Sequence, residues 1–149
     1  MTATMSAEER AEKLIDVTGR LADLLDQESE LVRKMEVGGI TVLQADKEAV
    51  AKVYQRLIGE VTEIPHVFDG LAESKRTRLK ESAERLDRAT MVNARSLKSA
   101  MDANTRLMET IAQAVREQQA ANNGYSASGA VDQNAQPGLS THVSLNQVL

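Results

Sequence analysis

Residues 71–119 contain neither glycine nor proline, and no other feature of this sequence restricts the fold as strongly. Apolar and small side chains recur along this stretch at alternating spacings of three and four, which is the repeat of a helix that packs along one face. One position of the repeat is held by Leu79, Leu86, Asn93, Ala100, Leu107 and Ala114, and the other by Ala83, Thr90, Leu97, Asn104, Ile111 and Gln118. A helix this long spans roughly 70 Å, beyond the diameter of a small globule. The pattern therefore predicts an elongated antiparallel helical bundle or coiled coil.

The start of the sequence predicts another helix. Residues 6–9 form a capping box, in which the Ser6 hydroxyl accepts from the first turn and the Glu9 carboxylate reaches back. The stripe that follows consists of Leu14, Val17, Leu21, Leu24, Leu31 and Met35, with Glu28 in one turn and Ile15, Thr18, Leu25 and Val32 at its edges. Gly38 and Gly39 are expected to end this helix, because glycine readily adopts the left-handed conformation past a helix C-terminus.

A second helix is expected after the glycines. Residues 41–44 form one candidate capping box, and Asp46 is a rival cap. Its apolar stripe consists of Val50, Val53, Leu57, Val61, Ile64 and Phe68. Pro65 either ends or bends this helix, because proline lacks an N–H and clashes with the preceding turn. We favour a break, with Asp69 and Gly70 in the joint.

Composition supports the same fold class. Aromatic residues make up only 2% of the 149 residues, whereas a compact globule of this size normally buries several. We therefore expect an all-α fold of three helices filled by aliphatic side chains. The expected organisation is a disordered N-terminus over residues 1–5, a helical domain over 6–121 and a disordered, flexible C-terminal tail over 122–149.

The tail has an unusual composition. It contains one formally charged residue, Asp132, and ends in an apolar segment with Val143, Leu145, Val148 and Leu149. Tyr125 lies between glycine-containing turns. It is either an anchor for a partner, combining apolar area with a hydroxyl, or a residue folded back on the helix end, and we favour the anchor.

Charge and residue inventory argue against several functions. The net charge of −4 opposes nucleic-acid binding, and the basic cluster in residues 75–80 is followed by acidic residues and has no interleaved aromatics. No apolar run approaches the roughly 18 residues of a membrane span. The chain has no cysteine and its N-terminus lacks a secretory pattern, so we expect a cytoplasmic protein without disulfides.

No constellation of residues indicates catalysis. His66 and His142 have no ligand spacing to a neighbour, and no glycine-rich phosphate loop follows a strand. Serine, histidine and acidic residues occur, but nothing orders them into a triad. We therefore expect no metal site, no cofactor and no enzymatic activity.

Helix lengths indicate a partner. The first helix is roughly 45 Å long and the second is expected to be shorter, so neither covers the last helix fully. The seam of the last helix also carries alanine, threonine and asparagine where leucine would pack best. It would therefore gain stability from another chain. Asn93 and Asn104 either fix register or oligomeric state, or line a groove. Met101 and Met108 are either filler beside the seam or adaptable contacts for a partner.

The sequence resembles the FlgN-type flagellar export chaperones, in particular the short forms of alphaproteobacteria. The resemblance rests on residues 46–54 at the start of the second helix, on residues 93–97 with Asn104, and on segments 124–129 and 144–149. The Tyr-x-x-x-Gly turn with the apolar tail end is its most specific part. One departure is the absence of the acidic residue that often precedes the glycine of this turn.

This resemblance implies a small cytoplasmic chaperone of flagellar type III secretion, which binds hook–filament junction proteins and delivers them to the export apparatus. Together with the apolar pattern it gives these candidate partner-binding residues: Leu97, Met101, Asn104, Leu107, Met108, Ile111, Tyr125, Val143, Leu145, Val148 and Leu149. The alternative is a structural coiled-coil component of flagellar basal-body assembly, whose seam serves self-association. The pattern is also compatible with a homodimer.

Overall fold

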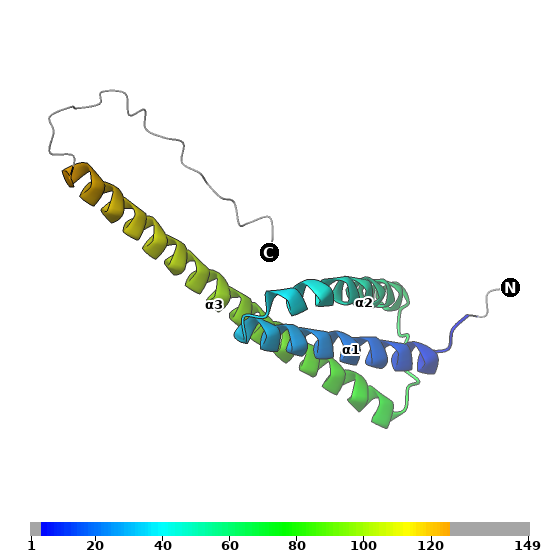
Figure 1. Cartoon of the computed structure of the whole chain (residues 1–149). Coiled ribbons are helices and arrows are strands. Elements are labelled where there is room, and N and C mark those ends of the chain that lie inside the picture. Colours follow the sequence, from blue (N-terminus) through cyan, green and yellow to red (C-terminus); the bar gives the residue numbers. More distant parts are fainter. Residues whose placement is uncertain (1–3, 126–149) are drawn as a thin grey trace. The chain divides into compact units, whose positions relative to one another are not determined.

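The computed structural model describes residues 4–125, which form three α-helices and no β-strand (Figure 1). The helices are α1 (Ala7–Arg33), α2 (Val37–Glu63) and α3 (Glu73–Tyr125). The chain divides into two compact units, residues 1–107 and 108–149, so α1, α2 and the first part of α3 belong to the first unit. The expected all-α class and three-helix bundle are confirmed.

The end of α3 differs from the predicted boundary. Residues 122–125, which we assigned to the tail, belong to the last turns of α3, and Tyr125 is its final residue. Asparagine and glycine are weak helix formers, but a terminal turn tolerates them. The predicted disorder of residues 1–3 and 126–149 lies outside the described residues.

α1 begins as predicted. The Glu9 N–H donates to Ser6 Oγ at 3.2 Å, and the Ser6 N–H donates to the Glu9 carboxylate at 2.8 Å. These hydrogen bonds hold the pKa of the Glu9 carboxyl below its ordinary value. The capping box therefore satisfies two N–H groups that would otherwise lack helical partners.

The end of α1 differs from the prediction. Met35, with φ of 59°, takes the left-handed position that we assigned to the glycines. The Glu36 N–H donates to the Leu31 carbonyl at 2.9 Å, and the Met35 N–H donates to the Val32 carbonyl at 3.1 Å. This pair of bonds is a Schellman motif, which satisfies the last carbonyls of the helix and reverses the chain.

Gly38 and Gly39 instead lie in the first turn of α2, so their predicted role was wrong. A Cβ on Gly39 would lie 2.9 Å from a methyl carbon of Leu31, so the glycine permits α1 and α2 to approach closely at their corner. Residues 41–44 and Asp46 lie inside α2, whose N-cap Glu36 makes no side-chain cap bond. The helix therefore starts earlier than expected and equals α1 in length, at 27 residues.

Residues 64–72 connect α2 to α3, and the expected break at Pro65 is confirmed. His66 adopts a positive φ of 58° and its ring lies 2.9 Å from the Asp69 carboxylate. Arg76, in the first turn of α3, donates to the carbonyls of Phe68 and Asp69 at 3.1 and 3.2 Å. The joint is thus held to the start of the helix that follows it.

Consecutive helices of the first unit run antiparallel. Arg10 of α1 lies 3.8 Å from Glu60 of α2, whereas Glu28, near the other end of α1, lies 2.6 Å from Lys47. α3 reverses again and runs parallel to α1. The central core cluster consists of Leu21, Ala22, Leu86 and Ala89, with Leu25, Val50, Ala51 and Tyr54 packed against it.

α2 packs less deeply than α1. Nine residues of α1 are buried, but only Leu57 of α2 is. Two members of the predicted stripe of α2, Val53 and Ile64, are each 38% exposed. The apolar pattern of α2 was read correctly as helical, but the bundle buries only part of it.

Candidate partner-binding surface

A buried ion pair joins α1 to α2 near the C-terminal end of α1. Glu28 is only 2% exposed, and its carboxylate lies 2.6 Å from the Lys47 ammonium. A carboxylate in an apolar stripe requires such a partner, because an unpaired buried charge is strongly unfavourable. The sequence placed Glu28 in the stripe without indicating which lysine balances it.

Asn93 of α3 lies at the same level of the bundle. It is 7% exposed, and its amide donates to the Leu25 carbonyl and to Ser29 Oγ, both at 3.4 Å. The Ser29 hydroxyl in turn donates to the Leu25 carbonyl at 2.9 Å. Asn93 therefore joins α3 to α1 inside the bundle, which favours the register interpretation over a groove. Asn104, the second candidate, is half-buried.

The basic cluster at the start of α3 serves the bundle. Lys75 and Arg78 each lie 3.2 Å from the Glu12 carboxylate of α1. Hydrogen bonds from Lys75 and then Arg78 hold the pKa of the Glu12 carboxyl below its ordinary value. These cations thus neutralise a carboxylate of their own chain, in agreement with the structural interpretation of the cluster.

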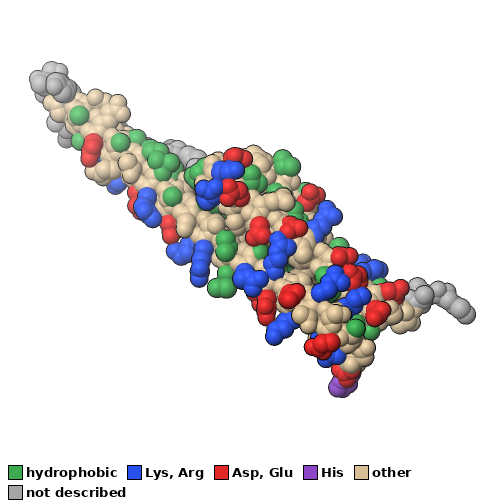
Figure 2. All heavy atoms as spheres, turned by 90° about the horizontal axis from the view of Figure 1, so that it is seen from below, with side chains coloured by type: hydrophobic (Ala, Val, Ile, Leu, Met, Phe, Trp, Pro, Cys, Tyr) green, Lys and Arg blue, Asp and Glu red, His purple; other side chains and the backbone are tan. Residues whose placement is uncertain are grey.

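Arg85, which lies on α3 after Lys75 and Arg78, also joins α3 to α1. Its guanidinium donates to the carboxylates of Asp23 and Asp26 and to the Gly19 carbonyl. The bond to Asp23 is the main reason that the pKa of Arg85 is raised. Arg85 therefore pairs with carboxylates of α1. Figure 2 shows the resulting surface, with cationic and anionic side chains intermixed.

An open groove of about 400 Å³ begins where α1 ends. Val32, Arg33 and Met35 form its end wall, and one face of α3 forms its floor. The floor residues are Arg95, Ser96, Ser99, Ala100 and Ala103. Val32 is 6% exposed, whereas Met35 is 65% exposed. We call this feature the α1-end groove.

Large apolar side chains of α3 are exposed in both units. In the first unit, Met101 is 59% exposed and Leu107 is 57% exposed. In the second unit, the values are 38% for Met108, 48% for Ile111 and 47% for Val115. Within each unit, neighbouring exposed apolar side chains are typical of a surface that another chain covers.

The predicted site residues have different environments. Leu97 and Asn104 are half-buried in the first unit, while Met101, Leu107, Met108 and Ile111 are exposed. Tyr125 ends α3, and its role as an anchor stays a prediction. The tail residues Val143, Leu145, Val148 and Leu149 lie outside the described residues.

Sequence reasoning missed the wall and most of the floor of the groove. Met35 was assigned to the buried stripe of the first helix, and Ser96, Ser99 and Ala103 were not considered as candidates. A signal was present, because Asn93, Ser96, Ala100 and Ala103 continue the spacing of three and four. What the sequence did not show was where α1 stops.

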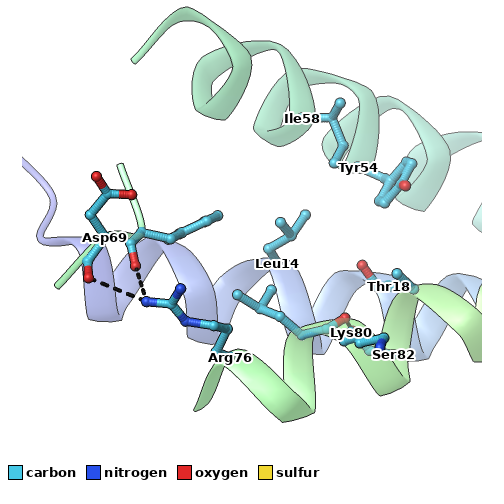
Figure 3. A pocket seen from close by; sticks show the side chains of 11 residues that line it. Leu14, Thr18, Tyr54, Ile58, Asp69, Arg76, Lys80 and Ser82 are labelled. Carbon is cyan, nitrogen blue, oxygen red and sulfur yellow. Dashed lines mark hydrogen bonds between the residues drawn. The ribbon is translucent and has the colours of Figure 1, made fainter. Parts of the chain in front are cut away.

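A second cavity of about 370 Å³ lies between the three helices near the joint (Figure 3). Leu14, Tyr54 and Ile58 line it from α1 and α2, and Arg76 lies at its edge (Figure 3). The Arg76 guanidinium is already engaged with the joint carbonyls, and Leu57 is the one residue of α2 that is buried.

Within residues 4–125, no group of three or more histidine, cysteine, aspartate or glutamate side chains is arranged to hold a metal ion. None of the described helices has an apolar stretch of the length needed to cross a bilayer. His66 is a residue of the joint, while His142 lies beyond the described residues.

Comparison with known proteins identifies no relative of this chain: no protein-family model, no curated protein and no solved structure matches it.

Proposed function

We propose that this protein is a helical chaperone that holds a segment of another protein against the uncovered face of α3. The observation that carries this proposal is the exposure of Met101 and Leu107 beside a groove at the point where α1 ends. Both residues lie on α3, C-terminal to the stretch of this helix that packs on α1 and α2. A helical client segment would cover them by laying its apolar face into the groove.

The FlgN-type resemblance makes the hook–filament junction proteins of the flagellum the candidate clients. On this proposal, the protein acts in the cytoplasm, binds such a protein before export and delivers it to the flagellar type III export apparatus. The methionine in the surface supports a carrier, because its flexible side chain adapts to more than one partner.

The second candidate function is a structural coiled-coil component of flagellar assembly. It is favoured by the spacing of Leu97, Met101, Asn104, Met108 and Ile111, which alternates between four and three in the sequence. Such spacing is also typical of helices that associate with copies of themselves. The two functions differ in stoichiometry, because only the first requires a different chain.

The test is co-purification of the full chain with each hook–filament junction protein, followed by measurement of the mass of the complex. We expect a complex that Leu107→Asp weakens, because a charge would enter the apolar contact. Thr105→Asp is the matched control, since Thr105 is exposed on α3 and is not among the candidate partner-binding residues. We also expect that deletion of the residues after Gln119 weakens the complex.

Two results would contradict the chaperone. One is a stable homo-oligomer that excludes every junction protein and survives the deletion, which would favour the structural component. The other is equal binding by Leu107→Asp and Thr105→Asp, which would place the client elsewhere on the molecule.

A further inference from the structure

The face of α3 that packs on α1 does not stop where α1 stops. Leu86 and Ala89 contact the α1 residues of the central core, and Asn93 bonds to α1. The same spacing of three and four continues through Ser96, Ala100 and Ala103. These three residues belong to the floor of the α1-end groove, so the groove is the continuation of an existing helix–helix interface.

The Schellman motif fixes the point where α1 ends and stops covering α3. Met35 turns the chain away, and α2 begins at Val37. Val32 of the last turn is still buried at 6% exposure, while Met35 is 65% exposed. In Figure 1 the end of α1 lies beside α3, which extends past it within the first unit. A helix placed in line with α1 would meet the same kind of surface that α1 itself meets.

The residues of the floor define what this helix must carry. Serine and alanine leave a cavity of about 400 Å³ open, so the opposing helix must present large side chains to reach close packing. Within the bundle a similar arrangement is present, because the core cluster combines Leu21 of α1 with the small Ala89 of α3. The complementary residues are therefore leucine, isoleucine, methionine or phenylalanine at alternating spacings of three and four.

The charges at the groove add a second requirement. Within the bundle, acidic residues of α1 pair with basic residues of α3, as Glu12 does with Lys75. The α1-end groove is lined by Arg33, whose guanidinium pairs with Glu30 of its own helix, and by Arg95 of α3. Acidic residues at the flanks of the opposing helix would complement Arg95.

We propose that the α1-end groove binds an amphipathic helix of a different chain, in line with α1, with bulky aliphatic residues at heptad spacing and acidic flanks. This proposal rests on the proposed function, because it names the kind of client segment that the chaperone takes. A second copy of this chain is a poor occupant. Its aliphatic α1 stripe is buried in its own bundle, and the small residues of two α3 floors would leave the cavity unfilled.

The first experiment uses a fluorescent label and a synthetic peptide. The chain has no cysteine, so Ser99→Cys gives a single attachment point in the groove for an environment-sensitive dye. The probe is a three-heptad peptide with leucine at two positions and glutamate at the flanks of each heptad. We expect a blue shift on titration, and at least tenfold weaker binding by a peptide with lysine in place of glutamate.

Unlabelled variants locate the contact by fluorescence anisotropy of a labelled peptide. Ala100→Arg fills the floor, and we expect it to weaken binding at least tenfold. Ser99→Arg, at an exposed position of the groove, gives the same test if Ala100→Arg unfolds. Ala94→Arg is the matched control, because Ala94 is exposed on the same helix and does not line the groove; its affinity should be unchanged.

Three results would overturn the inference. They are the absence of peptide binding to the wild-type chain, equal affinities of the groove variants and the Ala94→Arg control, and a shift of the Ser99 dye with protein concentration alone. The last result would show that a second copy occupies the groove. If a junction protein binds Ala100→Arg and Ser99→Arg normally, the proposed site in the groove is contradicted and the proposed chaperone function is not. Peptide binding without any junction-protein complex would instead contradict the proposed function and leave the groove site supported.

Discussion

Two stretches of α3 within the first unit have the same spacing but different surroundings. Residues 73–93 pack on α1 and α2, and there Leu86, Ala89 and Asn93 are buried. Residues 94–107 pass the end of α1, and there Met101 and Leu107 are exposed. A heptad pattern therefore indicates which face of a helix packs, but the lengths of the neighbouring helices determine where the packing ends.

The largest expected difference is in the stability lost when a buried or an exposed leucine of α3 is replaced. Leu86→Ala should lower the free energy of unfolding by about 2–5 kcal/mol, because it removes buried methyl groups and leaves a cavity. Leu107→Ala should change it by no more than about 0.5 kcal/mol, as is usual for exposed positions. Urea unfolding of both variants measures the two values. Equal losses would mean that Leu107 is covered in solution, and the comparison would fail.

The next effect concerns ion pairs. Lys47→Met should destabilise the protein by about 2–3 kcal/mol, because Glu28 would remain buried without its partner. This value is below the usual upper range because the Lys47 side chain is 22% exposed. Lys98→Met removes an exposed pair with Asp102 in the uncovered stretch and should cost less than about 0.5 kcal/mol.

A double variant sharpens the interpretation of the ion pair. Glu28→Met with Lys47→Met should recover most of the stability that Lys47→Met loses, because no uncompensated charge stays buried. Thermal melts of the single and double variants provide the measurement. A double variant as unstable as the single one would show that packing of the lysine stem, rather than its charge, stabilises this layer.

The two asparagines give a smaller contrast. Asn93→Ala should cost about 1 kcal/mol, because the hydrogen bonds to Leu25 and Ser29 are long and the Leu25 carbonyl keeps its bond from Ser29. Asn104→Ala should have an effect within about 0.5 kcal/mol, because Asn104 is only half-buried. Chemical denaturation measures both, and a larger loss at Asn104 would reverse the assignment of the covered and uncovered stretches.

The smallest effect depends on pH and concerns the pairing of Glu12 with Lys75 and Arg78. The folded state lowers the pKa of Glu12, so its contribution is fully present above the unfolded value of about 4.3 and is lost as the pH falls through the folded pKa. Glu12→Gln should therefore be less stable than the wild type at pH 7 and equal to it in strong acid. A difference that grows as the pH falls would contradict this pairing.

Local sequence determined several elements of the fold. The capping box at Ser6 and Glu9 formed as predicted, because both partners are within one turn of each other. Pro65 ended α2, because it removes an N–H wherever it stands. The long stretch without glycine or proline formed α3, and the scarcity of aromatic residues agreed with helices that pack through aliphatic side chains.

Other features were decided only by tertiary structure. Met35, rather than Gly38 or Gly39, took the left-handed position, and Gly39 instead lies in the first turn of α2, where a Cβ would meet the Leu31 side chain. Glu28 and Arg85 found their partners on other helices, which the spacing within one helix did not reveal. The α1-end groove depends on where α1 ends beside α3. The hydrogen bonds of a capping box and the steric limits of proline act between near neighbours in the sequence, whereas packing and charge pairing between helices depend on distances that exist only after the helices have come together.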